Sequence, residues 1–300
     1  MRILITGSNG MLGSDLVKEL SPHYEVSGIS RKSNRHSKIE YLQTDITNRS
    51  AVFKSISTLK PAIIIHAAAY TDVDGCESNP YLAYSTNVKA TEYISEASNQ
   101  QGATLFFIST DYVFDGTKSA PYEETDSPNP ISVYGRSKYE AEEFLKSHAR
   151  SAWILRSSWL FGADGRNFFN SILNRMQKGE ELKVVNDQRG APTYTKDLAY
   201  TLRILVEKGK RPKGCVIYHI ANSGETTWFG AAKMIMEKAE SSVRITPISS
   251  EDLNRPAKRP KSSIFNLNRI KIDYGIQLRN WKEAVDEFWV ESLSKQWESN

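Results

Sequence analysis

The sequence contains 300 residues, of which 39% are hydrophobic and 25% are charged, and its formal net charge is +4. This composition is typical of a globular protein with one large domain, or with one domain and a smaller lobe. The small net charge gives no reason to expect a nucleic-acid partner, and no apolar run approaches the roughly 18 residues of a membrane span. Cys76 and Cys215 have no nearby partner cysteine, so we expect free thiols and a cytoplasmic location.

The chain opens with a predicted strand, a glycine-rich turn and a helix. Residues 3–5 form an apolar run, Gly7, Gly10 and Gly13 follow, and leucines then recur at helical spacing as far as Leu20. In such a turn glycine lets a phosphate approach the backbone, and the helix N-terminus offers unpaired N–H groups to a pyrophosphate. We therefore predict a dinucleotide-binding turn. A purely structural turn would also need glycines, and the spacing is G-x-x-G-x-x-G rather than the commoner G-x-G-x-x-G.

A second strand is predicted over residues 24–29, and Ser30, Arg31 and Lys32 follow it. An acidic residue at this strand end would accept hydrogen bonds from the adenine ribose and would select NAD. The two basic side chains suit a 2′-phosphate instead, so the position favours NADPH as the cofactor, with NADH as the alternative. A solvated basic loop would contain the same residues.

Residues 39–43 predict a third strand, after which Asp45 and Ile46 precede a helix that begins near Asn48. The Asp45 carboxylate could lie near the adenine or could cap that helix, and the sequence favours neither interpretation. The helix carries apolar residues on one face, and Pro61 ends it.

A fourth strand is predicted over residues 62–65, and His66 stands at its end. We expect His66 to be a hydrogen-bonded packing residue, because no second metal ligand lies at helical spacing from it. Ala67, Ala68 and Ala69 then leave little side-chain bulk, so that a cofactor can lie against the backbone. Close packing would explain these alanines as well.

A long helix is predicted over residues 80–101, and it contains Asn87, a polar amide that needs hydrogen-bond partners if it is buried. A fifth strand over residues 105–109 leads into Thr110, which brings a hydroxyl group to the carboxyl edge of the sheet. Residues 116–130 are rich in Pro, Asp, Ser and Glu and predict a loop over that edge.

Tyr134 and Lys138 open the next predicted helix, and their i, i+4 spacing puts the phenol and the ammonium on one face. An unperturbed tyrosine has a pKa of about 10, and a nearby cation lowers it. We therefore expect Lys138 to lower the pKa of Tyr134, so that the pair exchanges a proton with a carbonyl or alcohol oxygen. The hydroxyl of Thr110 could hold the same oxygen. YxxxK also occurs by chance in helices, but its order after the glycine-rich turn and the strand-end hydroxyl favours catalysis.

The strict alternation of strands and helices loosens in the second half of the chain. The overall pattern predicts an α/β fold, a Rossmann-like doubly wound parallel sheet with a smaller C-terminal α/β substrate-binding lobe. We place the dinucleotide-binding domain at residues 1–160 and the lobe mainly at residues 161–300, with segments near 195–220 returning to the first domain. The later strands are predicted over residues 152–156, 182–185 and 216–220, and the later helices over 167–177, 196–207, 226–239 and 280–297.

The chain resembles the short-chain dehydrogenase/reductase superfamily in its extended, sugar-nucleotide-modifying branch, and within it the dTDP-4-dehydrorhamnose reductase family. The resemblance covers nearly the whole chain. GSNGMLG and YGRSKYEAE belong to the whole superfamily, whereas the STDYVF, NDQ-GAPT and RP-S patterns are more specific to this family. The matching stretches are GSNGMLG (7–13), HAAAYTDVDGCE (66–77), STDYVFDG (109–116), YGRSKYEAE (134–142), RSSWLFG (156–162), VVNDQRGAPT (184–193) and RPKSS (259–263).

The resemblance implies a reductase in which Thr110, Tyr134 and Lys138 form a catalytic triad. Tyr134 would donate a proton to the C4 keto oxygen of a nucleotide-linked 4-keto-6-deoxy sugar, while nicotinamide delivers a hydride to C4. Lys138 would tune Tyr134 and hold the nicotinamide ribose, and Thr110 would hydrogen-bond the carbonyl. The implied reaction is the NAD(P)H-dependent reduction of dTDP-4-dehydro-L-rhamnose to dTDP-L-rhamnose, and the implied assembly is a homodimer.

The residue patterns and the resemblance together indicate which residues bind the two ligands. Arg259 would pair with the nucleotide diphosphate, although the basic, proline-broken run 255–261 also suits a solvated loop. The residues expected at the nucleotide sugar are Asp111, Tyr112, Trp159 and Arg259. The residues expected at the cofactor are Gly7, Asn9, Gly10, Met11, Gly13, Ser30, Arg31, Asp45, Ile46, Ala67, Ala68, Ala69, Asn87, Tyr134 and Lys138.

Asp15 and Asp197 match positions where some members of the family hold Mg²⁺ between subunits. We nevertheless predict no metal site and favour a surface carboxylate at each position, because a hard cation needs several oxygen ligands, which the sequence does not supply. Two features depart from the family pattern. Residues 30–32 are basic where other members carry an acidic residue, and Arg189 stands where an aromatic residue is common.

Other functions stay open on the sequence alone. The protein could reduce another nucleotide 4-keto-6-deoxyhexose, or give the opposite stereochemistry at C4. The family is also similar to the non-catalytic regulatory β-subunit of methionine adenosyltransferase, and a redox-sensing dinucleotide binder would use the same first domain. The intact Thr110, Tyr134 and Lys138 favour an enzyme.

Overall fold

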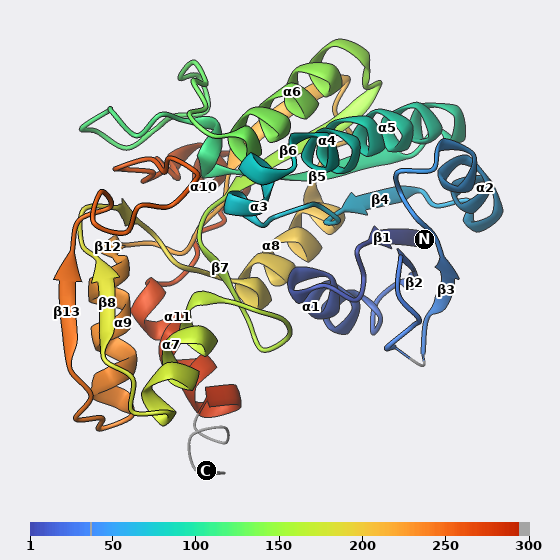
Figure 1. The fold of residues 1–300 in the computed structure, drawn as a ribbon. Coiled ribbons are helices and arrows are strands. Elements are labelled where there is room, and N and C mark those ends of the chain that lie inside the picture. The colour runs from blue at the N-terminus through green and yellow to red at the C-terminus, as the bar shows by residue number, and fades with distance from the viewer. Residues whose placement is uncertain (37, 294–300) are drawn as a thin grey trace.

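The protein is built around a parallel sheet (Figure 1), seen in a computed structural model that describes residues 1–36 and 38–293. The seven strands of the sheet are β1 (Arg2–Thr6), β2 (Glu25–Ser30), β3 (Glu40–Gln43), β4 (Ile63–His66), β5 (Thr104–Thr110), β6 (Ser151–Ser157) and β11 (Gly214–His219). They lie in the order β11-β6-β5-β4-β1-β2-β3, and every neighbouring pair is parallel. The predicted Rossmann-like doubly wound sheet is therefore confirmed.

Helices cover both faces of this sheet, which explains why its strands are apolar runs rather than alternating patterns. One face carries α1 (Met11–Leu20), α8 (Thr195–Lys208) and α10 (Asn268–Tyr274), and the other carries α2 (Arg49–Leu59), α5 (Ala90–Gln101) and α6 (Val133–His148) (Figure 1). Within β1, Ile3 and Ile5 belong to the first core and Leu4 to the second. A one-residue slip of this strand would therefore exchange its contacts on both faces.

The order of the strands leaves a crevice beside β1 and β4. From β1 the chain runs outward through β2 and β3, returns to β4 on the other side, and continues through β5 and β6. In open α/β sheets, ligands bind outside the carboxyl ends of the strands at the point where the order reverses. The glycine-rich turn after β1 and the alanines after β4 meet at this point.

The single helix predicted over residues 80–101 is confirmed in its extent, but its middle is a π-helical turn. α4 (Pro80–Tyr84) passes into a π-helical turn, η1 (Ser85–Lys89), before α5 begins. Residue spacing does not distinguish a widened turn from an α-helix, and π turns are frequent at functional sites. The turn carries the buried Asn87. A short helix that was not predicted, α3 (Val73–Ser78), precedes it.

A smaller lobe with its own apolar core lies to one side of the sheet (Figure 1). Its short strands pair between segments that are distant in sequence: β8 with β13, β7 with β10, and β9 with β12. The division of the chain near residue 160 stays a prediction, and α8 and β11 pack with the main sheet. The strands are β7 (Leu160–Phe161), β8 (Leu182–Val185), β9 (Arg189–Gly190), β10 (Thr193–Tyr194), β12 (Thr226–Thr227) and β13 (Ile245–Ile248).

The helices of the lobe follow the prediction closely, except at the end of the chain. They are α7 (Phe168–Gln177), α9 (Trp228–Lys238) and α11 (Trp281–Phe288). The predicted helix 280–297 passes after Phe288 into a π-helical turn, η3 (Trp289–Leu293), and its last residues lie outside the described part of the chain. In the described residues, no helix is long and apolar enough to cross a bilayer. Cys76 and Cys215 are free thiols.

Candidate active site

A cavity of about 680 Å³ opens at the carboxyl edge of the sheet, and residues of the main sheet and of the lobe line it together. Of the residues expected to bind cofactor or sugar, Gly13, Asn87 and Arg259 are not among those that line it. Those that line it are Gly7, Asn9, Gly10, Met11, Ser30, Arg31, Asp45, Ile46, Ala67, Ala68, Ala69, Thr110, Asp111, Tyr112, Tyr134, Lys138 and Trp159. The fold thus gathers residues from the ends of six strands, β1 to β6, into one space.

The glycine-rich turn places bare backbone at one end of the cavity. Gly7 has a φ of +70°, in the left-handed region, and a Cβ there would lie 2.9 Å from the backbone of Ala68. α1 begins directly after Gly10. Glycine has no side chain to cap the helix, so the first N–H groups of α1 have no side-chain partner. A Cβ on Gly13 would collide with the carbonyl oxygen of Gly7. Gly13 therefore serves the packing of helix against turn, which explains why it does not line the cavity.

The strand ends beside this turn carry the polar residues expected at the adenosine. Arg31 is exposed and lines the cavity after β2. Asp45 also lines it, and its carboxylate accepts hydrogen bonds from the backbone N–H (2.9 Å) and the hydroxyl (2.8 Å) of Thr47. The cap of α2 is Asn48, whose Oδ1 accepts from the N–H of Ala51 at 3.0 Å. The alternative in which Asp45 caps this helix is therefore wrong, because Asn48, three residues later, occupies the cap position.

Two buried polar residues support the cavity from behind. Asn87 accepts from the N–H of Tyr70 at 2.8 Å and donates to the carbonyl oxygen of Tyr70 (3.1 Å) and to the hydroxyl of Ser137 (3.0 Å). It thereby ties the loop after β4 to α6. His66 is, as predicted, a packing residue: its ring nitrogens contact the hydroxyls of Thr6 and Thr91, and burial lowers its pKa to about 3. The ring is therefore neutral at physiological pH.

Thr110, Tyr134 and Lys138 converge on the middle of the cavity. Ser132 caps α6 through the N–H of Gly135 at 3.1 Å, which fixes the first turn that carries Tyr134. The Lys138 ammonium, also in α6, donates to the carbonyl oxygen of Ile108 at 2.8 Å. Thr110, the last residue of β5, donates from its hydroxyl to the Asp111 carboxylate at 3.1 Å. The sheet edge and the helix therefore hold the three side chains from opposite sides.

Burial sets the protonation of this group in the free protein. It raises the pKa of the Tyr134 phenol well above its ordinary value, against a smaller opposing effect of the hydrogen bond with Thr110. It lowers the pKa of Lys138 to about 7, an effect that the nearby Glu142 opposes. The expected lowering of the Tyr134 pKa by Lys138 is thus not found. The physical reason is that both groups are removed from water, and the ammonium is bonded to a backbone carbonyl.

Asp111 offers the cavity an unused acceptor. Its side chain is buried, Oδ1 accepts from Thr110, and Oδ2 has no hydrogen-bond partner. Burial raises the pKa of the Asp111 carboxyl to about 6, an effect that hydrogen bonds from Ser263 and Thr110 to this carboxylate oppose. Ser157, at the end of β6, also lines the cavity with a buried hydroxyl that has no partner. An unpaired buried polar atom is costly, so these two atoms indicate where a ligand with hydroxyl groups would bind.

The sequence did not single out Trp228, which lines the cavity from the lobe. It opens α9, and its ring stacks on that of Trp159 with 3.6 Å between ring centroids and 5° between planes. Trp159 was expected at the sugar ring. No local pattern predicts this contact, because it joins a residue after β6 to the first turn of a helix in the lobe.

Arg259 lies beside the cavity rather than in its wall. Its guanidinium pairs with the Asp74 carboxylate of α3 at 2.8 Å and donates to the carbonyl oxygen of Ala257 at 2.9 Å. The guanidinium also acts on the nearby Tyr112 phenol, whose pKa burial raises and Arg259 lowers to a smaller extent. The basic run 255–261 is therefore docked on α3 in this structure, and the alternative of a freely solvated loop does not hold for Arg259.

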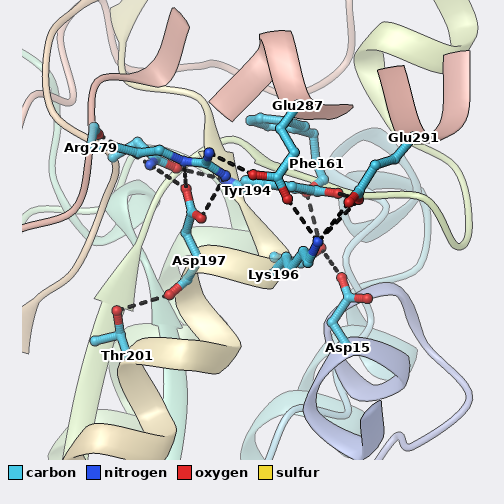
Figure 2. A network of polar contacts seen from close by, with 11 residues as sticks. Asp15, Phe161, Tyr194, Lys196, Asp197, Thr201, Arg279, Glu287 and Glu291 are labelled. Carbon is cyan, nitrogen blue, oxygen red and sulfur yellow. Dashed lines mark hydrogen bonds and ion pairs between the residues drawn. The ribbon is translucent and has the colours of Figure 1, made fainter. Parts of the chain in front are cut away.

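Asp15 and Asp197 are both bonded to other side chains of this chain (Figure 2). Asp15 accepts from the hydroxyl of Thr195 at 2.6 Å, whereas both oxygens of Asp197 accept from Arg279, at 2.8 Å and 2.9 Å. Lys196 supplies another cation nearby, bonded to Glu287 of α11 and to Glu291 of η3. Among the residues that the structure describes, no group of three His, Cys, Asp or Glu side chains is arranged to hold a metal. The Mg²⁺ alternative therefore has no support. The favoured interpretation of Asp15 as a surface carboxylate is wrong, because this side chain is buried.

Three comparisons with known proteins agree. Residues 1–294 match the family model of the RmlD substrate binding domain. A dTDP-4-dehydrorhamnose reductase of Aggregatibacter actinomycetemcomitans is 38% identical over 295 residues, which cover 95% of this chain and 97% of that protein. The spore coat polysaccharide biosynthesis protein SpsK of Bacillus subtilis is 35% identical and covers 98% of both. The crystal structure of a dTDP-4-dehydrorhamnose reductase from Bacillus anthracis in complex with NADP superposes with a TM-score of 0.89, at 38% identity, over 97% of this chain and 99% of that one.

Proposed function

The chain belongs to the RmlD substrate binding domain family, and on that premise we propose that it is a dTDP-4-dehydrorhamnose reductase. The enzyme reduces the C4 keto group of dTDP-4-dehydro-L-rhamnose with NADPH and gives dTDP-L-rhamnose. The observation that carries the proposal is the meeting of Thr110, Tyr134 and Lys138 in one cavity with the uncapped N-terminus of α1.

The residues around the first turn fit a dinucleotide. The bare backbone at Gly7 and Gly10 admits a pyrophosphate, to which α1 offers unpaired N–H groups. Arg31 would pair with a 2′-phosphate, and Asp45 and Ile46 would lie at the adenine. When bound, the reduced nicotinamide supplies the hydride that C4 accepts.

The chain's own groups supply the proton. Because burial raises the pKa of Tyr134, its phenol is neutral at physiological pH and carries the proton that O4 needs as C4 is reduced. The hydroxyl of Thr110 lies next to this phenol and holds the same oxygen. Lys138, bonded to the end of β5, places a cation near the phenolate that forms, and it binds the nicotinamide ribose.

The substrate lies between the sheet edge and the lobe. Asp111 accepts a sugar hydroxyl with its unpaired Oδ2, and Trp159 packs on the sugar ring. Tyr112 stands edge-on to Tyr134, with 5.5 Å between ring centroids, and completes the wall. Arg259, tied to Asp74 in the free protein, is the nearby cation for the diphosphate.

The test is NADPH oxidation by the purified protein with dTDP-4-dehydro-L-rhamnose, followed by NMR analysis of the configuration at C4. We expect substrate-dependent oxidation and a product identical to dTDP-L-rhamnose. Oxidation only with another nucleotide 4-keto-6-deoxyhexose, or the opposite C4 epimer, would replace the proposed substrate or product. Cofactor binding without turnover of any such sugar would favour the regulatory alternative.

A further inference from the structure

Two indoles that are distant in sequence stack in the wall of the cavity. Trp159 follows β6 and Trp228 opens α9, and both are half-buried. Their ring centroids lie 3.6 Å apart and their planes are within 5° of parallel. The stack therefore joins the edge of the main sheet to the lobe at the place where both line the cavity.

Trp159 needs support, because its backbone is strained. Its φ of +48° is in the left-handed region, which a bulky side chain rarely adopts and which persists only where the surroundings hold it. Gly190 leaves the space that this conformation requires, since a Cβ there would lie 2.5 Å from Cε2 of the Trp159 indole. The indole is thus packed against a bare backbone and against the ring of Trp228.

Trp228 is itself fixed by hydrogen bonds on the far side of the cavity wall. Its indole N–H donates to Oε1 of Gln188 at 3.1 Å, and Nε2 of this buried glutamine donates to the hydroxyl of Ser250 at 2.8 Å. Ser250 in turn donates to the carboxylate of Asp187 at 2.7 Å. The plane of Trp228 is therefore set by polar contacts that do not reach the ligand space.

We propose that Trp228 is a positioning residue that holds the indole of Trp159 against the sugar ring, and that Gln188 fixes Trp228 in turn. The inference rests on the proposed function, because it assigns the Trp159 face to a 6-deoxyhexose. Such a ring presents C–H groups and a methyl group, which suit a flat, immobile aromatic surface. Trp228 acts through Trp159, so its loss weakens sugar binding and leaves the cofactor and the proton donor in place.

The experiment compares Trp228→Leu and Gln188→Met with the wild-type enzyme and with Trp289→Phe, a control that alters an indole of the lobe core outside the cavity. We expect KM for the nucleotide sugar to rise about threefold to tenfold in Trp228→Leu, and less in Gln188→Met. We expect the Kd for NADPH to be unchanged in both. Trp228→Leu should also lose the exciton signal that stacked indoles give in far-ultraviolet circular dichroism, and Trp289→Phe should keep both signal and KM.

The outcomes separate this inference from the function on which it rests. Wild-type protein without turnover overturns the proposed function, and this inference with it. An active wild type whose Trp228→Leu variant loses the exciton signal but keeps its KM overturns only the inference. The inference is also overturned, and the proposed function is not, if the Kd for NADPH in Trp228→Leu rises as much as the KM for the sugar. If Trp228→Leu does not fold, Gln188→Met decides, and an unchanged KM there contradicts the proposal.

Discussion

The phenol of Tyr134 is the proton donor in the proposed reaction, and its environment suits that role. Burial keeps it protonated, so the enzyme begins the reductive direction with the required proton in place. Lysine and tyrosine at i, i+4 are readable in the sequence. The direction of the pKa shift is not, because it depends on the loss of water around both groups.

Replacing Tyr134 by Phe removes this proton and little else. We expect kcat to fall by about 10²- to 10⁴-fold, the usual contribution of a general acid, while NADPH binds as before. Steady-state NADPH oxidation and a fluorescence titration with NADPH measure the two effects. A variant that retains more than a tenth of the wild-type kcat would show that another group donates the proton.

Arg31 is the residue that would distinguish the two cofactors. Arg31→Ala should weaken NADPH binding by about tenfold, because a charge-assisted contact with the 2′-phosphate is lost, and should leave NADH binding nearly unchanged. Lys54→Ala, which removes an exposed cation from α2, controls for net charge. Equal losses for both cofactors in the Arg31 variant would mean that this side chain does not contact the 2′-phosphate.

The ammonium of Lys138 predicts a pH dependence. Burial lowers its pKa to about 7 in the free enzyme, so the charged form that we propose to bind the ribose is present below pH 7 and is lost as the pH rises. Since kcat/KM reports groups of the free enzyme, kcat/KM for NADPH should decline above about pH 7. A profile that stays flat up to about pH 9 would contradict this assignment.

At the scale of elements, a buried ion pair joins β6 to α6, the helix that carries the proposed catalytic residues Tyr134 and Lys138. Arg156 and Glu142 are both fully buried, with 2.6 Å between Nη2 and Oε2. The hydroxyl of Ser109 donates to the same carboxylate at 2.5 Å. The helix that carries Tyr134 and Lys138 is thus bonded to both β5 and β6 through Glu142.

Breaking this pair leaves one charge buried without its partner. We expect Glu142→Gln to lower the free energy of unfolding by about 3–5 kcal/mol, measured by urea denaturation. The double variant Glu142→Leu/Arg156→Met removes both charges and should recover most of that loss. A single variant within about 1 kcal/mol of the wild type would show that the pair contributes little to stability.

At the scale of the whole molecule, ion pairs join α11 and η3 at the end of the lobe to α8 (Figure 2). Arg279 bridges Asp197 of α8 and Glu287 of α11, and Lys196 of α8 bonds to Glu287 and Glu291. The carboxylates of this contact are neutralised by cations of the chain itself. The ion pairs join the lobe to a helix that packs on the main sheet.

This arrangement predicts stability that does not depend on a metal. Treatment with EDTA should leave the Tm unchanged, whereas Arg279→Met should lower the free energy of unfolding by about 2 kcal/mol, because charge-assisted hydrogen bonds are lost. Differential scanning calorimetry with and without chelator, and urea denaturation of the variant, provide the measurements. A Tm that falls on chelation and recovers with added Mg²⁺ would instead support the magnesium alternative. The homodimer that the resemblance implies stays a prediction, and the molar mass from light scattering would test it.

Local patterns in the sequence were enough for the elements of the main sheet, the glycine-rich turn and the shared face of Tyr134 and Lys138. Each depends on residues within a few positions of one another, where apolar spacing and glycine act directly on the backbone. Most of the candidate site could therefore be predicted, because the ends of parallel strands meet at one edge.

Tertiary packing alone decided the rest. The stack of Trp228 on Trp159, the unpaired oxygen of Asp111, the π turn around Asn87 and the docking of Arg259 on Asp74 all depend on what lies opposite each side chain. The protonation state of Tyr134 also depends on tertiary packing, because burial raises its pKa. Burial and long-range contacts arise only when segments far apart in the chain come together, and no spacing within one segment records them.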